Sequence, residues 1–109
     1  MKLPSADQVQ IDERKVRDYL LSKVHPVGRF KARVFAAVGF DESTVQAFVA
    51  EIRRIASSGD VLEVGDMEFG RKYTVRRELV GPVGSLRVLT VWIQETGHEV
   101  VRLVTVRPE

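Results

Sequence analysis

The sequence of 109 residues contains no cysteine and only two histidines. Without thiols it can form no disulfide, no cysteine-ligated zinc site and no thiol nucleophile. A tight transition-metal site would need carboxylates in unfavourable places, so we expect no metal. The absence of cysteine also suits a reducing compartment, and we expect a cytoplasmic protein.

The common signatures of cofactor and hydrolase chemistry are missing as well. There is no glycine-rich phosphate loop, no HExxH or GxSxG motif and no calcium-binding loop. No apolar stretch approaches the roughly 18 residues of a membrane span, and the start, MKLPSADQVQ, lacks the apolar run of a signal peptide. We therefore expect no cofactor and no membrane partner.

Chemistry that needs only side-chain acids, bases and cations stays open. Metal-independent RNA cleavage is of this kind, because the ribose 2′-OH is the nucleophile. The protein has only to deprotonate that hydroxyl, neutralise the phosphate charge and protonate the leaving 5′-oxygen.

The hydrophobic spacing predicts one α+β domain, and 44% hydrophobic residues are enough for a single core. Residues 1–11 are polar and lack helical periodicity, so we expect a flexible N-terminal arm, followed by the single domain over residues 12–109. Apolar residues at three- and four-residue intervals predict helices over about 12–24, 29–38 and 41–58.

Each predicted helix carries an apolar stripe, which in the first helix consists of Val16, Tyr19, Leu20 and Val24. His25 and Pro26 end the first helix, and Gly39 ends the second in a left-handed conformation. In the second helix we expect the buried residues to be Phe30, Val34, Ala37 and Val38. The third has the cleanest stripe, made of Val45, Phe48, Val49, Ile52 and Ile55.

After Gly59 the hydrophobic period falls from about 3.6 to about 2, which predicts strands. These are a short edge strand near 61–64, a half-exposed strand over 73–79, a central strand over 86–94 and a last strand over 100–106. The expected fold is two to three N-terminal helices packed on one face of a roughly four-stranded antiparallel sheet (α-α-α-β-β-β-β). The other face is then left for solvent or a ligand.

The net charge is only +2, but the cations are clustered. One run without a carboxylate contains Lys23, Arg29, Lys31 and Arg33 together with His25, and a second contains Arg71, Lys72, Arg76 and Arg77. Such patches are compatible with an RNA partner or simply with a solvated surface. We treat Arg29, Arg33, Arg71 and Lys72 as candidate nucleic-acid contacts, and Trp92 as either a base-stacking platform or a core residue.

Five residues are candidates for catalysis. His25 can exchange protons near neutral pH or cap a helix end, and Lys31 opens the second predicted helix, where it is either functional or solvated. Arg76 and Arg102 form either a phosphate clamp on the open sheet face or cross-strand pairs with Glu78 or Glu99. Thr105 shares the face of Leu103 by alternation, at the rim of the core.

Three segments carry a family resemblance: HPxGxxKAxxF over residues 25–35, the GPxG turn with the later TxW over residues 81–92, and RLVT over residues 102–105. They resemble a small bacterial domain of unknown function that occurs alone and at the C-terminal ends of phage head-morphogenesis and toxin-like proteins. The similarity covers roughly residues 16–106, although this chain has Val101 where many members have proline before RLVT.

The order of helices and strands is in turn similar to the barnase, EndoU, colicin and RelE-like nucleases. That similarity implies a basic residue from the helices, His25 or Lys31, facing Arg76, Arg102 and Thr105 on the sheet. The resulting hypothesis is a metal-independent endoribonuclease of toxin type, with an antitoxin- or immunity-type protein as partner. The alternative is a non-catalytic module that binds a protein or nucleic acid.

Overall fold

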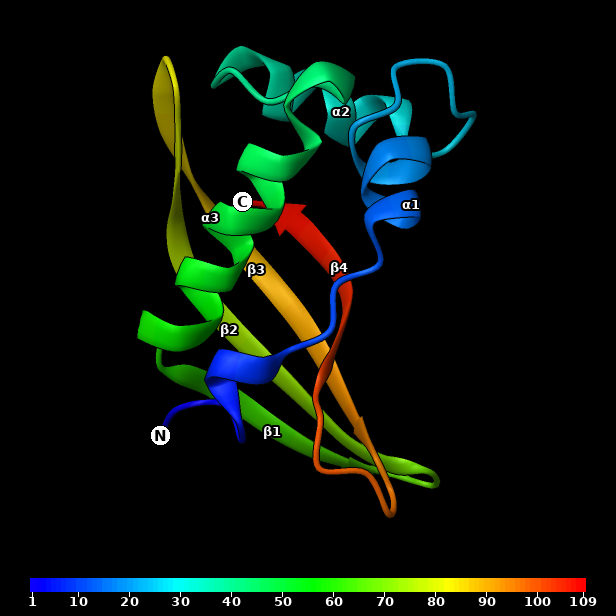
Figure 1. Cartoon of the computed structure of the whole chain (residues 1–109), viewed down its shortest axis with the longest axis vertical. Helices are drawn as coiled ribbons and strands as arrows, with labels where there is room; N and C mark the ends of the chain where they lie inside the picture. The colour runs from blue at the N-terminus through cyan, green and yellow to red at the C-terminus, as the bar shows by residue number, and fades with distance from the viewer.

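The computed structural model describes all 109 residues and has its helices in the first half of the chain and a four-stranded antiparallel sheet in the second (Figure 1). The helical elements are η1 (Ala6–Gln8), α1 (Glu13–Lys15), η2 (Val16–Leu20), α2 (Arg29–Ala37), η3 (Glu42–Thr44) and α3 (Val45–Ser58). The strands are β1 (Val61–Met67), β2 (Gly70–Gly81), β3 (Gly84–Glu95) and β4 (Arg102–Pro108). The predicted fold class is confirmed.

The strands follow one another across the sheet in the order β1-β2-β3-β4. β3 therefore pairs on both sides, as its two apolar faces predicted, while β1 and β4 form the edges. The GPxG turn joins β2 to β3, with Gly81 opposite Gly84. A Cβ on Gly81 would stand 2.0 Å from the carbonyl oxygen of Val38, so this glycine lets the turn pack against the end of α2.

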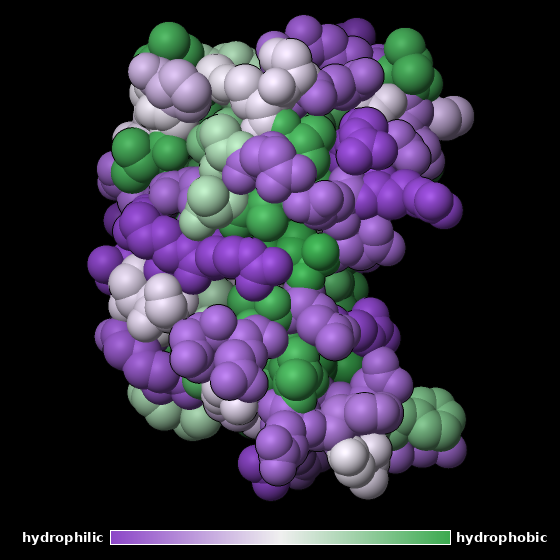
Figure 2. Space-filling model, viewed as in Figure 1, coloured by the Kyte–Doolittle hydropathy of each residue, from purple (hydrophilic) through white to green (hydrophobic).

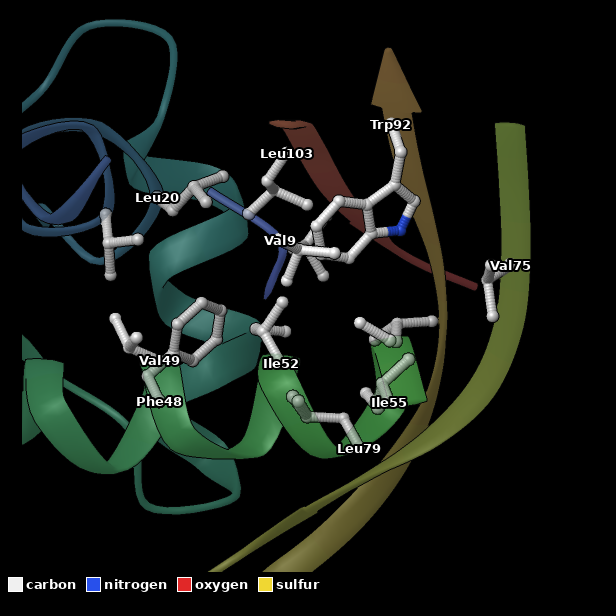
Figure 3. Close-up of a cluster of buried hydrophobic side chains, with 14 of the residues drawn as sticks. Val9, Leu20, Phe48, Val49, Ile52, Ile55, Val75, Leu79, Trp92 and Leu103 are labelled. Carbon is white, nitrogen blue, oxygen red and sulfur yellow. The ribbon is translucent and has the colours of Figure 1, made fainter. Parts of the chain in front are cut away.

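The core lies between α3 and the inner face of the sheet. All five residues of the predicted α3 stripe are buried. Figure 3 shows Ile52 and Ile55 pointing from α3 towards the sheet residues Trp92 and Val75. The helix is preceded by a capping box, in which Asp41 and Thr44 satisfy each other's backbone N–H groups.

Helix α2 has nearly the predicted length but buries a different face. Ala32 and Phe35 are buried, whereas Phe30 is 59% and Val34 41% exposed. The ring of Phe35 packs edge-on against Phe48 of α3, with 5.2 Å between ring centroids. Because α2 carries apolar residues around most of its circumference, spacing alone did not reveal which of them would face the core.

The first helix is shorter than predicted. After one α turn the chain widens into a π turn, in which the N–H of Leu21 donates to the carbonyl of Val16. The hydroxyl of Ser22 then accepts the N–H groups of Val24 and His25 and turns the chain outwards. Val24, placed by its spacing on the buried stripe, is 85% exposed.

The first eleven residues, expected to form a flexible arm, lie against the domain in this structure. Leu3 and Val9 are each only 3% exposed and belong to the core. Gln10 pairs with the start of β4 through 2.9 Å hydrogen bonds to Val101 and Leu103. Leu3 and Val9 join the core although they show no helical spacing, which is why the sequence did not indicate their burial.

None of the helices has the length and apolar character needed to cross a membrane.

Candidate functional site

A β-bulge in β4 decides where Thr105 lies. Leu103 pairs with Trp92 and Thr105 with the adjacent Val91, so Val104 is an extra residue without a partner. Neighbouring residues of a strand point to opposite faces, so Thr105 does not follow Leu103 to the rim of the core as simple alternation predicted. It lies half-buried at the edge of the sheet.

At this edge, the structure brings Lys31 of α2 and Thr105 of β4 together. The Lys31 Nζ donates a 2.9 Å hydrogen bond to the Thr105 Oγ1. Beside it, the Lys15 Nζ donates to the carbonyl oxygen of Val104, and the ring centroid of Tyr19 lies 5.8 Å from the Lys31 Nζ. These five residues line an open hollow of about 460 Å³, which we call the β4 edge site.

The β4 edge site is cationic and has no counter-anion. Burial lowers the pKa of Lys31, and the positive charges of Arg107 and Lys15 lower it further. None of these three cations forms an ion pair with a carboxylate. An unneutralised group of cations of this kind attracts an anionic ligand.

The HPxG segment forms the tight turn that leads into α2, the helix that carries Lys31. The Nδ1 of His25 accepts the N–H groups of Val27 and Gly28, both at 3.0 Å, so Nδ1 carries no proton and Nε2 does. The His25 ring packs edge-on against Tyr19, with 4.7 Å between centroids. A Cβ on Gly28 would stand 2.1 Å from the Tyr19 carbonyl oxygen, so only glycine allows α2 to begin this close to η2.

His25 itself does not line the hollow. Its Nδ1 accepts hydrogen bonds from the two residues just before α2, and its ring packs against the ring of Tyr19. Through these contacts it positions the helix that carries Lys31. The HPxGxxK and RLVT segments, which lie far apart in the sequence, thus meet in the contact between Lys31 and Thr105.

Arg76 and Arg102 are not brought to this contact and do not form a pair. Arg76 forms a 2.7 Å ion pair with Glu109, and Arg102 a 2.8 Å ion pair with Glu95. Their partners on β3, Leu89 and Ile93, are four residues apart, which corresponds to about 13 Å along a strand. Each guanidinium is instead neutralised locally, although not by the carboxylates expected from the sequence.

The structure places the candidate nucleic-acid contacts in different environments. Trp92 is fully buried, and its Nε1 donates to the Thr90 Oγ1 at 2.8 Å, so its ring cannot stack on a base. Arg71 pairs with Asp66 at 3.2 Å, and the guanidinium of Arg29 stacks on Phe30 at 4.7 Å. Arg33 and Lys72 are exposed and have no ion-pair partner.

Sequence reasoning did not find Lys15 and Tyr19, which line the hollow, or Arg107, whose charge acts on Lys31 from outside it. Arg107 follows Thr105 by two residues, and that spacing on one strand is the signal that could have identified it. Tyr19 looked like part of a buried helix stripe, and Lys15 like any solvated lysine on a helix.

The chain belongs to the family described as a domain of unknown function, DUF6883, whose model matches residues 2–109. The structure is similar to a chain of a contact-dependent growth inhibition toxin–immunity protein complex from Klebsiella pneumoniae 342, with a TM-score of 0.70 and 16% identity. The match covers 91% of this chain and 98% of that chain. At this identity the likeness shows a shared fold. No curated protein sequence matches the chain.

Proposed function

We propose that this domain is a metal-independent endoribonuclease of toxin type and that the β4 edge site is its active site. The observation that carries the proposal is the contact between Lys31 and Thr105, set among cations that have no acidic partner. Such a site combines a base, a group that orients it and positive charge for a phosphate. A chain of a toxin–immunity protein complex has a similar fold, which is compatible with a toxin or with an immunity module.

Lys31 acts as the general base. Its lowered pKa increases the fraction of neutral amine at a given pH, and only the neutral amine can accept a proton. One amine N–H is held by the Thr105 Oγ1, which directs the nitrogen lone pair into the hollow. The amine takes the proton of the ribose 2′-OH, and the oxygen attacks the adjacent phosphorus.

The remaining residues serve the phosphate and the leaving group. Lys15 and Arg107 neutralise the charge that builds up on the phosphate oxygens. Tyr19, which also lines the hollow, donates its hydroxyl proton to the leaving 5′-oxygen as the P–O5′ bond breaks. The products are a 2′,3′-cyclic phosphate and a free 5′-hydroxyl, and no metal takes part.

The test is incubation of the purified protein with tRNA and with total RNA in EDTA, beside Lys31→Ala and a control, Arg87→Ala, at an exposed position of β3. We expect the wild type and Arg87→Ala to leave 2′,3′-cyclic phosphate ends, and Lys31→Ala to leave RNA intact. Intact RNA with all three proteins, or equal cleavage by all three, would sink the proposal. Salt-sensitive RNA binding without cleavage would instead support the non-catalytic alternative.

A further inference from the structure

Four apolar residues stand exposed in a row along the outer side of α2 and the loop before it. They are Val24 (85%), Val27 (63%), Phe30 (59%) and Val34 (41%), which we call the α2 outer surface. Phe30 and Val34 are four residues apart on α2 and so share one face of the helix, and Val24 and Val27 lie in the turn that leads into it. Figure 2 shows hydrophobic groups at the surface of this end of the molecule, among hydrophilic ones.

The charged residues in the segment that carries the α2 outer surface are all positive. Lys23 precedes Val24, Arg29 and Arg33 lie between its apolar residues, and the sequence contains no Asp or Glu between Asp18 and Asp41, whose carboxylate feels the charge of Lys23. None of the three cations has an ion-pair partner. An apolar ridge edged by free cations fits a surface that is apolar in the middle and acidic around it.

A second exposed apolar row is interleaved with carboxylates. Leu62, Val64 and Met67 on β1, together with Phe69, alternate with Glu63, Asp66 and Glu68, of which Asp66 pairs with Arg71. An acidic partner therefore meets two unpaired carboxylates at the β1 edge and only cations in the segment around α2.

The α2 outer surface adjoins the β4 edge site. Lys31, whose amine reaches Thr105, follows Phe30 directly on the same helix, and the rings of His25 and Tyr19 connect the loop to the hollow. A protein seated on Phe30 and Val34 would stand at the rim of that hollow and exclude an RNA strand.

We propose that the α2 outer surface is the docking site of a neutralising protein, one that surrounds an apolar groove with carboxylates. The inhibitory consequence rests on the proposed nuclease function, but the docking itself does not. Such an inhibitor is expected to be encoded beside this chain, because a nuclease kept inside the cell must be silenced as it is made.

The experiment titrates the full chain by calorimetry with the purified products of the two flanking genes. The test variant is Phe30→Ser/Val34→Ser, and the matched control is Leu62→Ser/Val64→Ser on β1, since all four side chains are exposed to a similar degree. Unfolding curves of both variants check that they fold like the wild type.

We expect one acidic product to bind the wild type and the β1 control equally, and the α2 variant about tenfold more weakly or worse. Its affinity should fall between about 50 and about 500 mM salt. The proposal is overturned by equal binding to all three proteins, by loss of binding in the β1 control alone, or by the absence of any binding. It is also overturned if wild type but not the α2 variant sediments with phosphatidylglycerol vesicles, since the surface would then be a lipid contact.

A parallel RNA cleavage assay separates this proposal from the nuclease proposal. Binding that depends on Phe30 and Val34, without any cleavage, would retain the docking site and reject the nuclease. Cleavage by a chain that binds no partner through Phe30 would retain the nuclease and reject the docking site. If both hold, the partner should stop cleavage by the wild type and leave cleavage by the α2 variant largely unaffected.

Discussion

Helices α2 and α3 are neighbours in the chain and both are rich in apolar residues, yet they use those residues differently. Helix α3 turns its whole stripe into the core. Helix α2 buries Ala32 and Phe35, directs Lys31 to the β4 edge site and leaves Phe30 and Val34 in solvent. Packing alone explains α3, whereas α2 has more apolar surface than the core accepts. The excess is where we expect function.

The largest expected difference between the two helices is in catalysis. Lys31→Ala should reduce RNA cleavage by about 10² to 10⁴-fold, the usual contribution of a general base. Replacing an exposed α3 residue of similar charge, Arg54→Ala, should change the cleavage rate by less than about twofold. Initial rates on a short RNA oligonucleotide measure both. A comparable loss in the two variants would remove the functional distinction between α2 and α3.

The second difference is in stability. Phe48 of α3 is fully buried and meets the rings of both Phe35 and Phe40 edge-on, so Phe48→Ala should lower the free energy of unfolding by about 3–5 kcal/mol. Phe30→Ala on α2 should lower it by no more than about 0.5 kcal/mol. Urea unfolding of the two variants compares them directly. A large loss for Phe30→Ala would mean that its ring belongs to the core in solution.

The pH dependence of cleavage tests whether Lys31 of α2 acts as the base. Because the charge of Lys15 helps to lower the pKa of Lys31, Lys15→Gln should raise that pKa towards its ordinary value. The neutral base then forms only at higher pH, so the rising limb of the pH–rate profile should move to the alkaline side by a fraction of a unit to about one unit. Arg17→Gln, two residues away, serves as control. If the midpoint of the profile stays the same while the rate falls, Lys15 does not influence the pKa of the base, Lys31.

The smallest expected effect is on the free energy of unfolding when Lys31 is replaced. The folded-state pKa of Lys31 is lower than its unfolded value of 10.5, so the fold disfavours the charged amine. The folded state consequently binds fewer protons between the two pKa values, and stability rises with pH across that window. Lys31→Met should therefore be slightly more stable than the wild type near neutral pH, and the gap should narrow as the pH approaches 10.5. Unfolding curves at several pH values test this, and a gap that widens with pH would contradict it.

The sequence predicted the order of elements because the hydrophobic period changes once, from helical to extended, near Gly59. It also selected Lys31 and Thr105 by chemical type and by the HPxGxxK and RLVT segments. The resemblance implied that His25 or Lys31 faces Thr105, whereas alternation placed Thr105 at the rim of the core, because alternation cannot show the bulge at Val104. Lys15 and Arg107 were missed because an isolated cation in a sequence looks the same whether it faces solvent or another cation.

Arg76 and Arg102 show the converse limitation. Both were expected on the open sheet face, where Arg76 and Arg102 are indeed exposed. Glu109 at the end of the chain and Glu95 at the end of β3 neutralise them. Glu95 shares a face with Ile93, the partner of Arg102, so this pairing depends on the strand register, which the sequence pattern does not give. Sequence reasoning found cations of the right kind but could not tell which had a carboxylate within reach.

The bulge in β4 limits what mutagenesis by substitution can reveal. Lys15 is held by the main-chain oxygen of Val104, and every replacement of that residue keeps the oxygen. A scan of side chains would therefore detect Lys15 and Thr105 and pass over Val104. The requirement at position 104 is for a residue to be present and not for its side chain. Removing Val104 would leave Leu103 opposite Trp92 and Thr105 opposite Val91 in a regular ladder, and would take away the oxygen that Lys15 contacts.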